Sequence, residues 1–225
     1  MTSDLSTWTT CPLPARTPIE GRYIRLEPFA EEHIAPLFAA SMAQGKEERH
    51  RYLFEPPMDR AEFQTWFEAK MLQSDPLYFS VTDKESGHAV GRQCFMRIDP
   101  AHGVIEIGSI LWGPSMARSR LATEALYLFA KTAFETLGYR RFEWKCNNEN
   151  EPSKRAAERF GFTYEGLFRQ HMIAKGKNRD TAWFSMLDGE WLALKAAYEV
   201  WLDPSNFDDE GQQKRSLQNL IGSRA

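Results

Sequence analysis

Residues 104–125 join a strand-like apolar pattern to a helix-like one through a loop of small and basic residues. The first turn of a helix presents N–H groups without partners in the helix, together with the positive end of the helix dipole, so it can hold a diphosphate. In this loop arginines would add charge, and hydroxyl side chains would add donors. The candidate phosphate contacts are Arg118, Ser119, Arg120, Leu121, Ala122 and Thr123. An ordinary helix start with two solvated arginines would explain the same pattern.

The composition is that of a folded globular chain, with 225 residues of which 42% are hydrophobic and 26% charged. No segment approaches the ~20 consecutive apolar residues that span a bilayer. The first residues also lack the basic region and apolar core of a signal peptide. These features predict a cytoplasmic protein with no membrane partner.

Charge and cysteine content predict neither a nucleic-acid partner nor a structural metal. The net charge is −3, which gives no general attraction to nucleic acid, so any phosphate binding must be local. Cys11, Cys94 and Cys146 lack the spacing of a disulfide framework or a metal site. We therefore expect three reduced thiols.

Hydrophobic periodicity predicts the elements that position the loop. Alternation favours strands, and apolar spacings of three and four favour helices. The predicted strands cover 23–28, 77–83, 89–99, 103–112, 140–147, 168–175 and 179–187, and the predicted helices cover 30–42, 60–72, 121–137, 152–161 and 189–202. Helix 121–137 has the strongest pattern and ends at Gly138, a typical helix stop. This order predicts a mixed α/β class with a largely antiparallel sheet.

One domain is expected, over residues 19–202. Residues 1–18 are rich in Pro and Thr, and should form an arm that either lies on the domain or is loose in solvent. The polar tail, residues 203–225, has one apolar group at Leu217, Leu220 and Ile221. It would suit a short docking helix, or it could equally be loose.

Several motifs, taken in order, resemble those of the GNAT acyltransferases, in particular the branch of the RimJ and RimL ribosomal-protein N-terminal acetyltransferases. The resemblance covers roughly residues 19–190, and its motifs are RYIRLEPF, IEIGSILWGP, ARSRLATEALYLFAKTAFETLGYRRFEWKC, NEPSKRAAERFGFTYEG and RDTAWFSML. It implies the GNAT fold, an α/β (α+β) sheet flanked by helices whose central strand bends away from its neighbour at a bulge. The resemblance also implies that the pantetheine arm of CoA pairs with this strand at Ile110, Leu111 and Trp112.

The loop departs from the family pattern of Gln or Arg, two residues, Gly, one residue, then Gly or Ala. Aligned on Ala122, this chain has Ala117 and Arg120 at the first two signature positions. Glycine tolerates any backbone angle, so Arg120 must adopt a backbone that suits a residue with a Cβ atom. The N–H groups of the main chain would still be available.

The resemblance implies acetyl-CoA as cosubstrate and transfer of the acetyl group directly to a primary amine, and it suggests catalytic groups. Glu106 is the candidate general base, because the branch often has an acidic residue there; a glutamate facing solvent or pairing with an arginine is the alternative. Ser153 is the candidate general acid and, together with Asn150, an implied contact to CoA near its sulfur and pantetheine, although Asn150 also fits a helix cap. A backbone N–H at Leu111 would stabilise the oxyanion. His171 is expected to have a surface or core role.

The acceptor remains open, as either a protein N-terminus or a small-molecule amine. An alternative function is a non-catalytic CoA-binding sensor or interaction module with a GNAT-like fold, which the changed loop at Ala117 and Arg120 would favour. Glu106 and the NEPS motif favour an enzyme. We expect a monomer or a homodimer.

Overall fold

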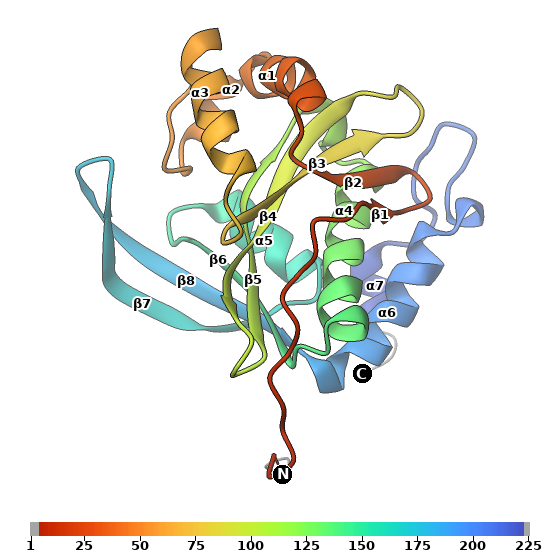
Figure 1. Cartoon of the computed structure of the whole chain (residues 1–225). Helices are drawn as coiled ribbons and strands as arrows, with labels where there is room; N and C mark the ends of the chain where they lie inside the picture. The colour runs from red at the N-terminus through yellow and green to blue at the C-terminus, as the bar shows by residue number, and fades with distance from the viewer. Residues whose placement is uncertain (1–4, 223–225) are drawn as a thin grey trace.

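The computed structural model describes residues 5–222, which build one eight-stranded sheet in the order β1-β2-β3-β4-β5-β6-β8-β7 (Figure 1). β5 and β6 are parallel, and all other neighbouring strands are antiparallel. The strands are β1 Ile19–Glu20, β2 Ile24–Pro28, β3 Leu77–Asp83, β4 Ala89–Asp99, β5 Val104–Trp112, β6 Arg141–Asn147, β7 Thr163–Ala174 and β8 Lys177–Leu187. The predicted fold class is confirmed.

Helices cover the sheet in two groups. In Figure 1, α4 and α6 lie along one side of the sheet, α1, α2 and α3 gather at its upper end, and the β7–β8 hairpin extends to the left. The helices are α1 Ile34–Met42, α2 Lys46–His50, α3 Arg60–Met71, α4 Arg120–Lys131, α5 Glu151–Arg159, α6 Asp188–Leu202 and α7 Leu217–Gly222. Short 3-10 turns occupy Glu31–His33, Pro114–Met116 and Pro204–Asn206.

The main core forms around α4, which is buried at every residue from Ala122 to Ala130. Its Phe129 ring stacks on Phe95 of β4, with centroids 3.8 Å apart. The predicted helix continues past α4 as a π-helical turn, Thr132–Thr136, and the chain then turns at Gly138, whose φ is +69°. The segment with the strongest helical spacing of apolar residues therefore forms α4, the central helix of the fold.

A second apolar cluster lies between α1, α3 and the strands β3 and β4. Phe29 stacks on Phe67 of α3 with centroids 4.0 Å apart, and Tyr78 of β3 also stacks on Phe29, at 5.1 Å. These aromatic contacts hold α3 against the sheet.

Glu124 of α4 ties the start of β2 to the central helix. Its buried carboxylate accepts hydrogen bonds from the N–H groups of Arg22, Tyr23 and Ile24, at 2.6 to 2.9 Å. Charge-assisted hydrogen bonds of this kind are stronger than neutral ones. They fix the position of α4, and hence of the loop before it, relative to the sheet.

Both terminal segments pack on the domain, as far as the structure describes them. Trp8 donates from Nε1 to the carbonyl of Ala101 at 2.8 Å, and the buried Cys11 donates its N–H to Pro100 at 3.0 Å. In the tail, α7 buries Leu217 and Leu220 in the main core. The N-terminal arm therefore lies on the domain rather than loose in solvent, and the tail forms a short docking helix, as far as residues 5–222 show. Residues 1–4 and 223–225 of the two predicted segments lie outside the described residues.

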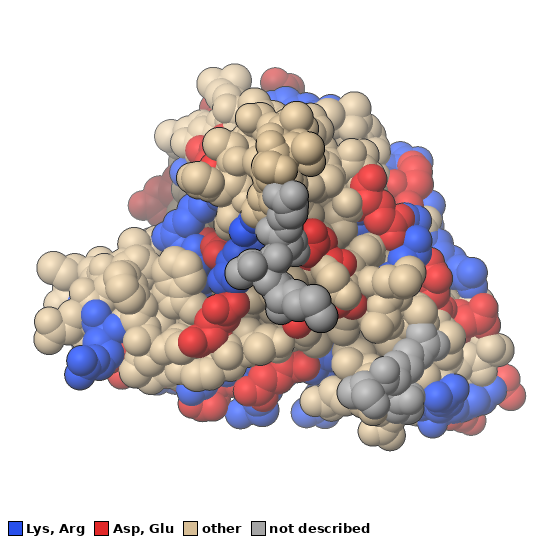
Figure 2. All heavy atoms as spheres, turned by 90° about the horizontal axis from the view of Figure 1, so that it is seen from below, with Lys and Arg blue, Asp and Glu red and all other residues tan. Residues whose placement is uncertain are grey.

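Basic and acidic side chains are interspersed on the face seen from below, and Figure 2 shows no continuous basic patch there.

Candidate active site

β5 leaves its neighbour halfway along its length. Its parallel pairing with β6 ends at Ile107 and Trp144, although both strands continue. On the other side of β5, Arg92 pairs with Leu111 and Cys94 with Gly108, so β5 has an extra residue, a bulge at Ser109 with φ of +48°. A bulge bends its strand. The expected splayed central strand is present, and the opening lies between β5 and β6.

Arg92 of β4 holds the bulge in place. Its guanidinium donates to the backbone oxygen of Ser109 at 2.8 Å and to the Ser109 hydroxyl at 2.7 Å. It also forms an ion pair with Glu55, in the segment between α2 and α3. This pair connects residues 51–59 to the opened strand.

A cleft with a volume of about 910 Å³ lies at the N-terminus of α4. The predicted loop forms one part of it, α5 a second and the C-terminal tail a third. Lining residues include Trp112, Arg118, Ser119, Arg120, Leu121, Ala122, Thr123, Arg159, Phe160, Phe207 and Gln213. All six loop residues of the sequence prediction, and Trp112 of the central strand, therefore meet in one cleft. Ile110, Leu111, Asn150 and Ser153 do not line it.

The arginines of this cleft have no acidic partners. Within residues 5–222, no carboxylate oxygen lies within 4.0 Å of the guanidinium nitrogens of Arg118, Arg120 or Arg159. Arg159 donates to the buried Thr123 hydroxyl at 3.1 Å, and burial lowers its pKa. Asp83 and Glu85 also line the cleft, but the three arginines outnumber them and pair with neither, which suits an anionic ligand. The sequence prediction did not include Arg159.

The helix start is also uncapped. Ser119 occupies the N-cap of α4, but its hydroxyl donates to the Met116 carbonyl at 2.9 Å and caps no N–H group. The left-handed residue of the loop is Arg118, with φ of +56°, whereas Arg120 begins the helix. Arg120 therefore needs no glycine backbone, and its guanidinium lies 4.6 Å from the Tyr23 ring centroid.

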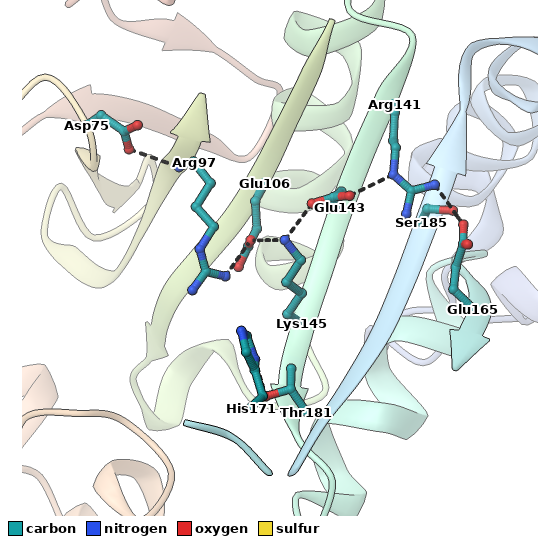
Figure 3. A network of polar contacts seen from close by, with 10 residues as sticks. All are labelled: Asp75, Arg97, Glu106, Arg141, Glu143, Lys145, Glu165, His171, Thr181 and Ser185. Carbon is teal, nitrogen blue, oxygen red and sulfur yellow. Dashed lines mark hydrogen bonds and ion pairs between the residues drawn. The ribbon is translucent and has the colours of Figure 1, made fainter. Parts of the chain in front are cut away.

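Glu106 lies on β5, one residue before the pairing with β6 ends, and its side chain is buried in an ion-pair network (Figure 3). Its Oε2 atom contacts Arg97 of β4 at 3.0 Å and Lys145 of β6 at 2.9 Å. The alternative of pairing with an arginine is thus observed for Oε2. No side chain of the described residues hydrogen-bonds to Oε1, so one carboxylate oxygen can still accept from water or from an amine.

The network continues along β6 and reaches β7. Lys145 contacts Glu143 at 2.6 Å, Glu143 contacts Arg141 at 2.6 Å, and Arg141 contacts Glu165 of β7 at 2.7 Å (Figure 3). The ion-paired groups are three carboxylates, of Glu106, Glu143 and Glu165, and three bases, Arg97, Arg141 and Lys145. The charges of this network therefore balance.

His171 of β7 points toward the Arg97 and Lys145 end of the network in Figure 3. Its Nδ1 atom lies 3.0 Å from the Thr181 hydroxyl. Partial burial, and then the charges of Arg97, Arg179 and Lys145, lower its pKa, so its imidazole is neutral at pH 7. The ring also contacts Phe168 and Trp183, which agrees with the expected surface or core role.

Asn150 and Ser153 meet at the start of α5. The Asn150 side chain accepts from the Ser153 N–H at 3.2 Å, so Asn150 is a helix cap, as one alternative held. The Ser153 hydroxyl accepts from Trp144 Nε1 at 3.0 Å, and a second side-chain hydrogen bond joins it to Cys146. Burial raises the pKa of the nearby Cys146 thiol, which is therefore protonated at neutral pH.

The sheet register argues against Leu111 as the oxyanion donor. The Gly113 N–H donates to Val90 of β4 at 2.9 Å, and N–H groups two residues apart on a strand point the same way. The Leu111 N–H therefore points to β4, while that of Trp112 points to the opened side.

Among residues 5–222 no three metal-ligating side chains cluster, and no helix there has the length and apolar character to cross a membrane.

Comparison with known proteins places these features in context. Residues 24–163 match the model of the acetyltransferase (GNAT) domain. The structure is similar to that of a GCN5-related N-acetyltransferase from Brucella melitensis, with 58% identity, a TM-score of 0.95 and coverage of 97% of this chain and 100% of that one. Two curated relatives are an uncharacterized N-acetyltransferase p20 of Bacillus licheniformis and alpha/beta-tubulin-N-acetyltransferase 9 of Mus musculus.

The first of these relatives is 34% identical over 50% of this chain, and the second is 30% identical over 67% of it. The chain matches 63% and 66% of their respective lengths. These relatives support the family, and the RimJ and RimL branch stays a prediction.

Proposed function

Because this chain belongs to the GNAT acetyltransferase family, we propose that it transfers an acetyl group from acetyl-CoA directly to a primary amine. The observation that supports this proposal most is the cleft at the N-terminus of α4, where three arginines that pair with no carboxylate of residues 5–222 lie beside uncapped N–H groups. That donor set fits a diphosphate, and Ala122 is small enough for close approach. Acetyl-CoA supplies an activated thioester when bound.

Residues 118–123 and Arg159 would hold the phosphates, and the opened edge of β5 at Ile110, Leu111 and Trp112 would pair with the extended part of the ligand. Main-chain N–H groups facing the opening, such as that of Trp112, are suited to stabilise the carbonyl oxygen as it gains charge. Leu111 would then contribute its carbonyl and side chain rather than its N–H group.

On the acceptor side, the incoming amine must lose a proton while its nitrogen bonds to the acetyl carbon and the carbon–sulfur bond breaks. Glu106 would accept that proton through Oε1, directly or by an ordered water. The Ser153 hydroxyl would pass a proton to the departing sulfur and recover one from solvent, to which Glu106 releases the proton that it accepted. Because burial raises the pKa values of Cys94 and Cys146, neither thiol is suited to attack as a thiolate, which favours direct transfer.

The acceptor is proposed to be a protein N-terminus or a small-molecule amine. An α-amine, with a pKa of about 8, is partly neutral at pH 7, whereas a lysine at about 10.4 needs a stronger base. An N-terminus would agree with the RimJ and RimL resemblance. We place the enzyme in the cytoplasm, as a monomer or homodimer.

A non-catalytic CoA sensor is the competing function. Its main support was the changed loop, but Arg120 is an ordinary first helical residue and remains next to the cleft. The Oε1 atom of Glu106, to which no side chain of residues 5–222 hydrogen-bonds, favours turnover.

The test is calorimetric titration with acetyl-CoA, desulfo-CoA and ATP, followed by thiol release with a panel of primary amines. We expect micromolar binding of both CoA compounds, weaker binding of ATP, and amine-dependent thiol release. Binding without release on any amine would support the sensor, and absence of binding would reject both functions.

A further inference from the structure

Arg179 of β8 is a buried cation that the ion-pair network leaves out. Side chains alternate between the faces of a strand, so Arg179, Thr181 and Trp183 share one face of β8. Trp183 is paired with Lys145 of β6, which places Arg179 on the face of the sheet that carries Glu106. Arg179 is 9% exposed.

The Arg179 guanidinium makes no hydrogen bond and no ion pair with any of residues 5–222, and its Nε atom is buried without an acceptor. It lies over the ring of Phe54, 5.0 Å from the centroid, and burial lowers its pKa. Buried charges are normally paired, and a buried donor without an acceptor is rare in native proteins. Trp183 Nε1, on the same face, is a second buried donor without an acceptor.

Hydrogen bonds between segments of the chain fix the position of Phe54 beside Arg179. Phe54 belongs to the segment between α2 and α3. Lys175, at the tip of the β7–β8 hairpin, donates to the carbonyls of His50 at the end of α2, at 2.9 Å, and of Arg51 in this segment, at 3.4 Å. Tyr52 of the same segment donates to the Glu149 carbonyl at 3.0 Å. The ring over Arg179 is therefore tied to two other parts of the chain.

The neighbouring charges cannot satisfy Arg179, because the three carboxylates of the network are already matched by three bases. Arg179 is therefore a positive charge without an ionic partner among residues 5–222, on the face of the sheet where the acceptor would meet Glu106. Arg179 does not line the cleft at α4, so the phosphates proposed for that cleft do not account for it.

We propose that Arg179 binds a carboxylate carried by the acceptor, which makes the preferred substrate an amine with a nearby carboxylate. This inference rests on the proposed acetyltransferase function. A planar carboxylate matches the two-pronged donor geometry of a guanidinium. The carboxylate has two possible sources, a free α-amino acid or an acidic side chain next to a peptide N-terminus.

The kinetic test compares matched acceptors that differ only in this group. One arm uses alanine against alaninamide, and the other uses amidated peptides that begin Ala-Asp against peptides that begin Ala-Asn. We expect kcat/KM to favour the carboxylate by about tenfold or more in one arm, which identifies the source. Arg179→Gln should abolish this preference, and Arg179→Lys should retain part of it. The exposed hairpin variant Arg169→Gln is the matched control and should keep it.

A binding arm works without turnover. CoA-saturated protein is titrated with N-acetylalanine and N-acetylalaninamide, and with the acetylated forms of both peptides. Tighter binding of a carboxylate form that Arg179→Gln removes supports the proposal. Equal binding of the matched forms, or a preference that survives in Arg179→Gln, overturns it.

Failure of the acetyltransferase function would look different, as absence of transfer to every amine tested. Arg179→Met should melt no lower than the parent protein, because it removes an unpaired buried charge. If Arg179→Met instead melts well below the parent protein, Arg179 is structural and the proposal is wrong.

Discussion

The two sides of the opened strand treat positive charge in opposite ways. At the cleft before α4, three arginines pair with no carboxylate of residues 5–222, whereas on the Glu106 side six ion-paired groups balance and Arg179 is unpaired within the same residues. A side with several unpaired bases is suited to a ligand that brings several negative charges. A side that neutralises itself except at one point is suited to a ligand that brings one.

Glu106→Gln should have the largest effect, because it removes the base but leaves the arginine cleft intact. Turnover is expected to fall by about 10²- to 10⁴-fold while acetyl-CoA affinity stays unchanged, as measured by steady-state kinetics and calorimetry.

The control for this change is Glu143→Gln, which also removes a buried carboxylate next to Lys145 and should lower the melting temperature with a much smaller loss of turnover. Equal losses of turnover in the two variants would mean that Glu106 acts only as part of the network.

Charge reversal in the cleft should affect binding of the donor. Arg159→Glu is expected to weaken acetyl-CoA binding by about 3 kcal/mol, roughly a hundredfold, and Arg118→Glu should act in the same direction. Arg155→Glu is the control, since this exposed residue lies on the same helix but does not line the cleft. Calorimetry at fixed ionic strength measures the affinity of both variants. A similar loss of affinity in Arg155→Glu would mean that Arg159→Glu acts through the overall charge and not through a contact in the cleft.

Phe207→Ala should have a smaller effect on the same cleft. The Arg120 guanidinium lies 5.3 Å from the Phe207 ring centroid, and loss of this contact should weaken acetyl-CoA binding by about 1 kcal/mol. Leu192→Ala, an exposed apolar residue on α6, should leave the affinity unchanged. Unchanged affinity in Phe207→Ala would show that the tail does not position Arg120.

The smallest effect concerns the titration of His171. Arg179→Gln removes one of the charges that lower the His171 pKa, so NMR titration should find that pKa raised, with no change in Arg169→Gln. The unfolded imidazole binds its proton near pH 6.5, but the folded one only at lower pH, so His171 lowers stability as pH falls through that window. Because Arg179→Gln raises the pKa of the folded imidazole, it should narrow the pH range over which His171 lowers stability. If the pKa of His171 is the same in Arg179→Gln and the parent protein, Arg179 lies too far from His171 to act on this face of the sheet.

Local pattern was enough for much of the fold. β3 and β4 were predicted at their observed bounds, because alternation and flanking turns mark both strands clearly. α2 was missed, since five polar residues after a left-handed Gly45 carry no apolar period. β7 begins at Thr163 instead of 168, because its first residues are exposed on both faces and show no alternation.

The candidate site was less accessible to such reasoning. The cleft loop was found because its residues are consecutive, and it does line the cleft. Arg159 acts beside Thr123, and Lys145 beside Glu106, through contacts between elements distant in sequence. Arg179 was missed for a related reason, since the signal is the absence of a partner, which only a packed structure can show.

The lining of the cleft by residues 207 and 211–213 also bears on how the protein is made. A chain emerges from the ribosome with its N-terminal part first, and its early segments can begin to fold before the rest appears. The sheet and α4 would therefore form while one wall of the cleft was still being synthesised. The cleft would be complete only after residues 207 and 211–213 had emerged, so a chain that ended before them could fold over much of its length and still lack one wall of the cleft.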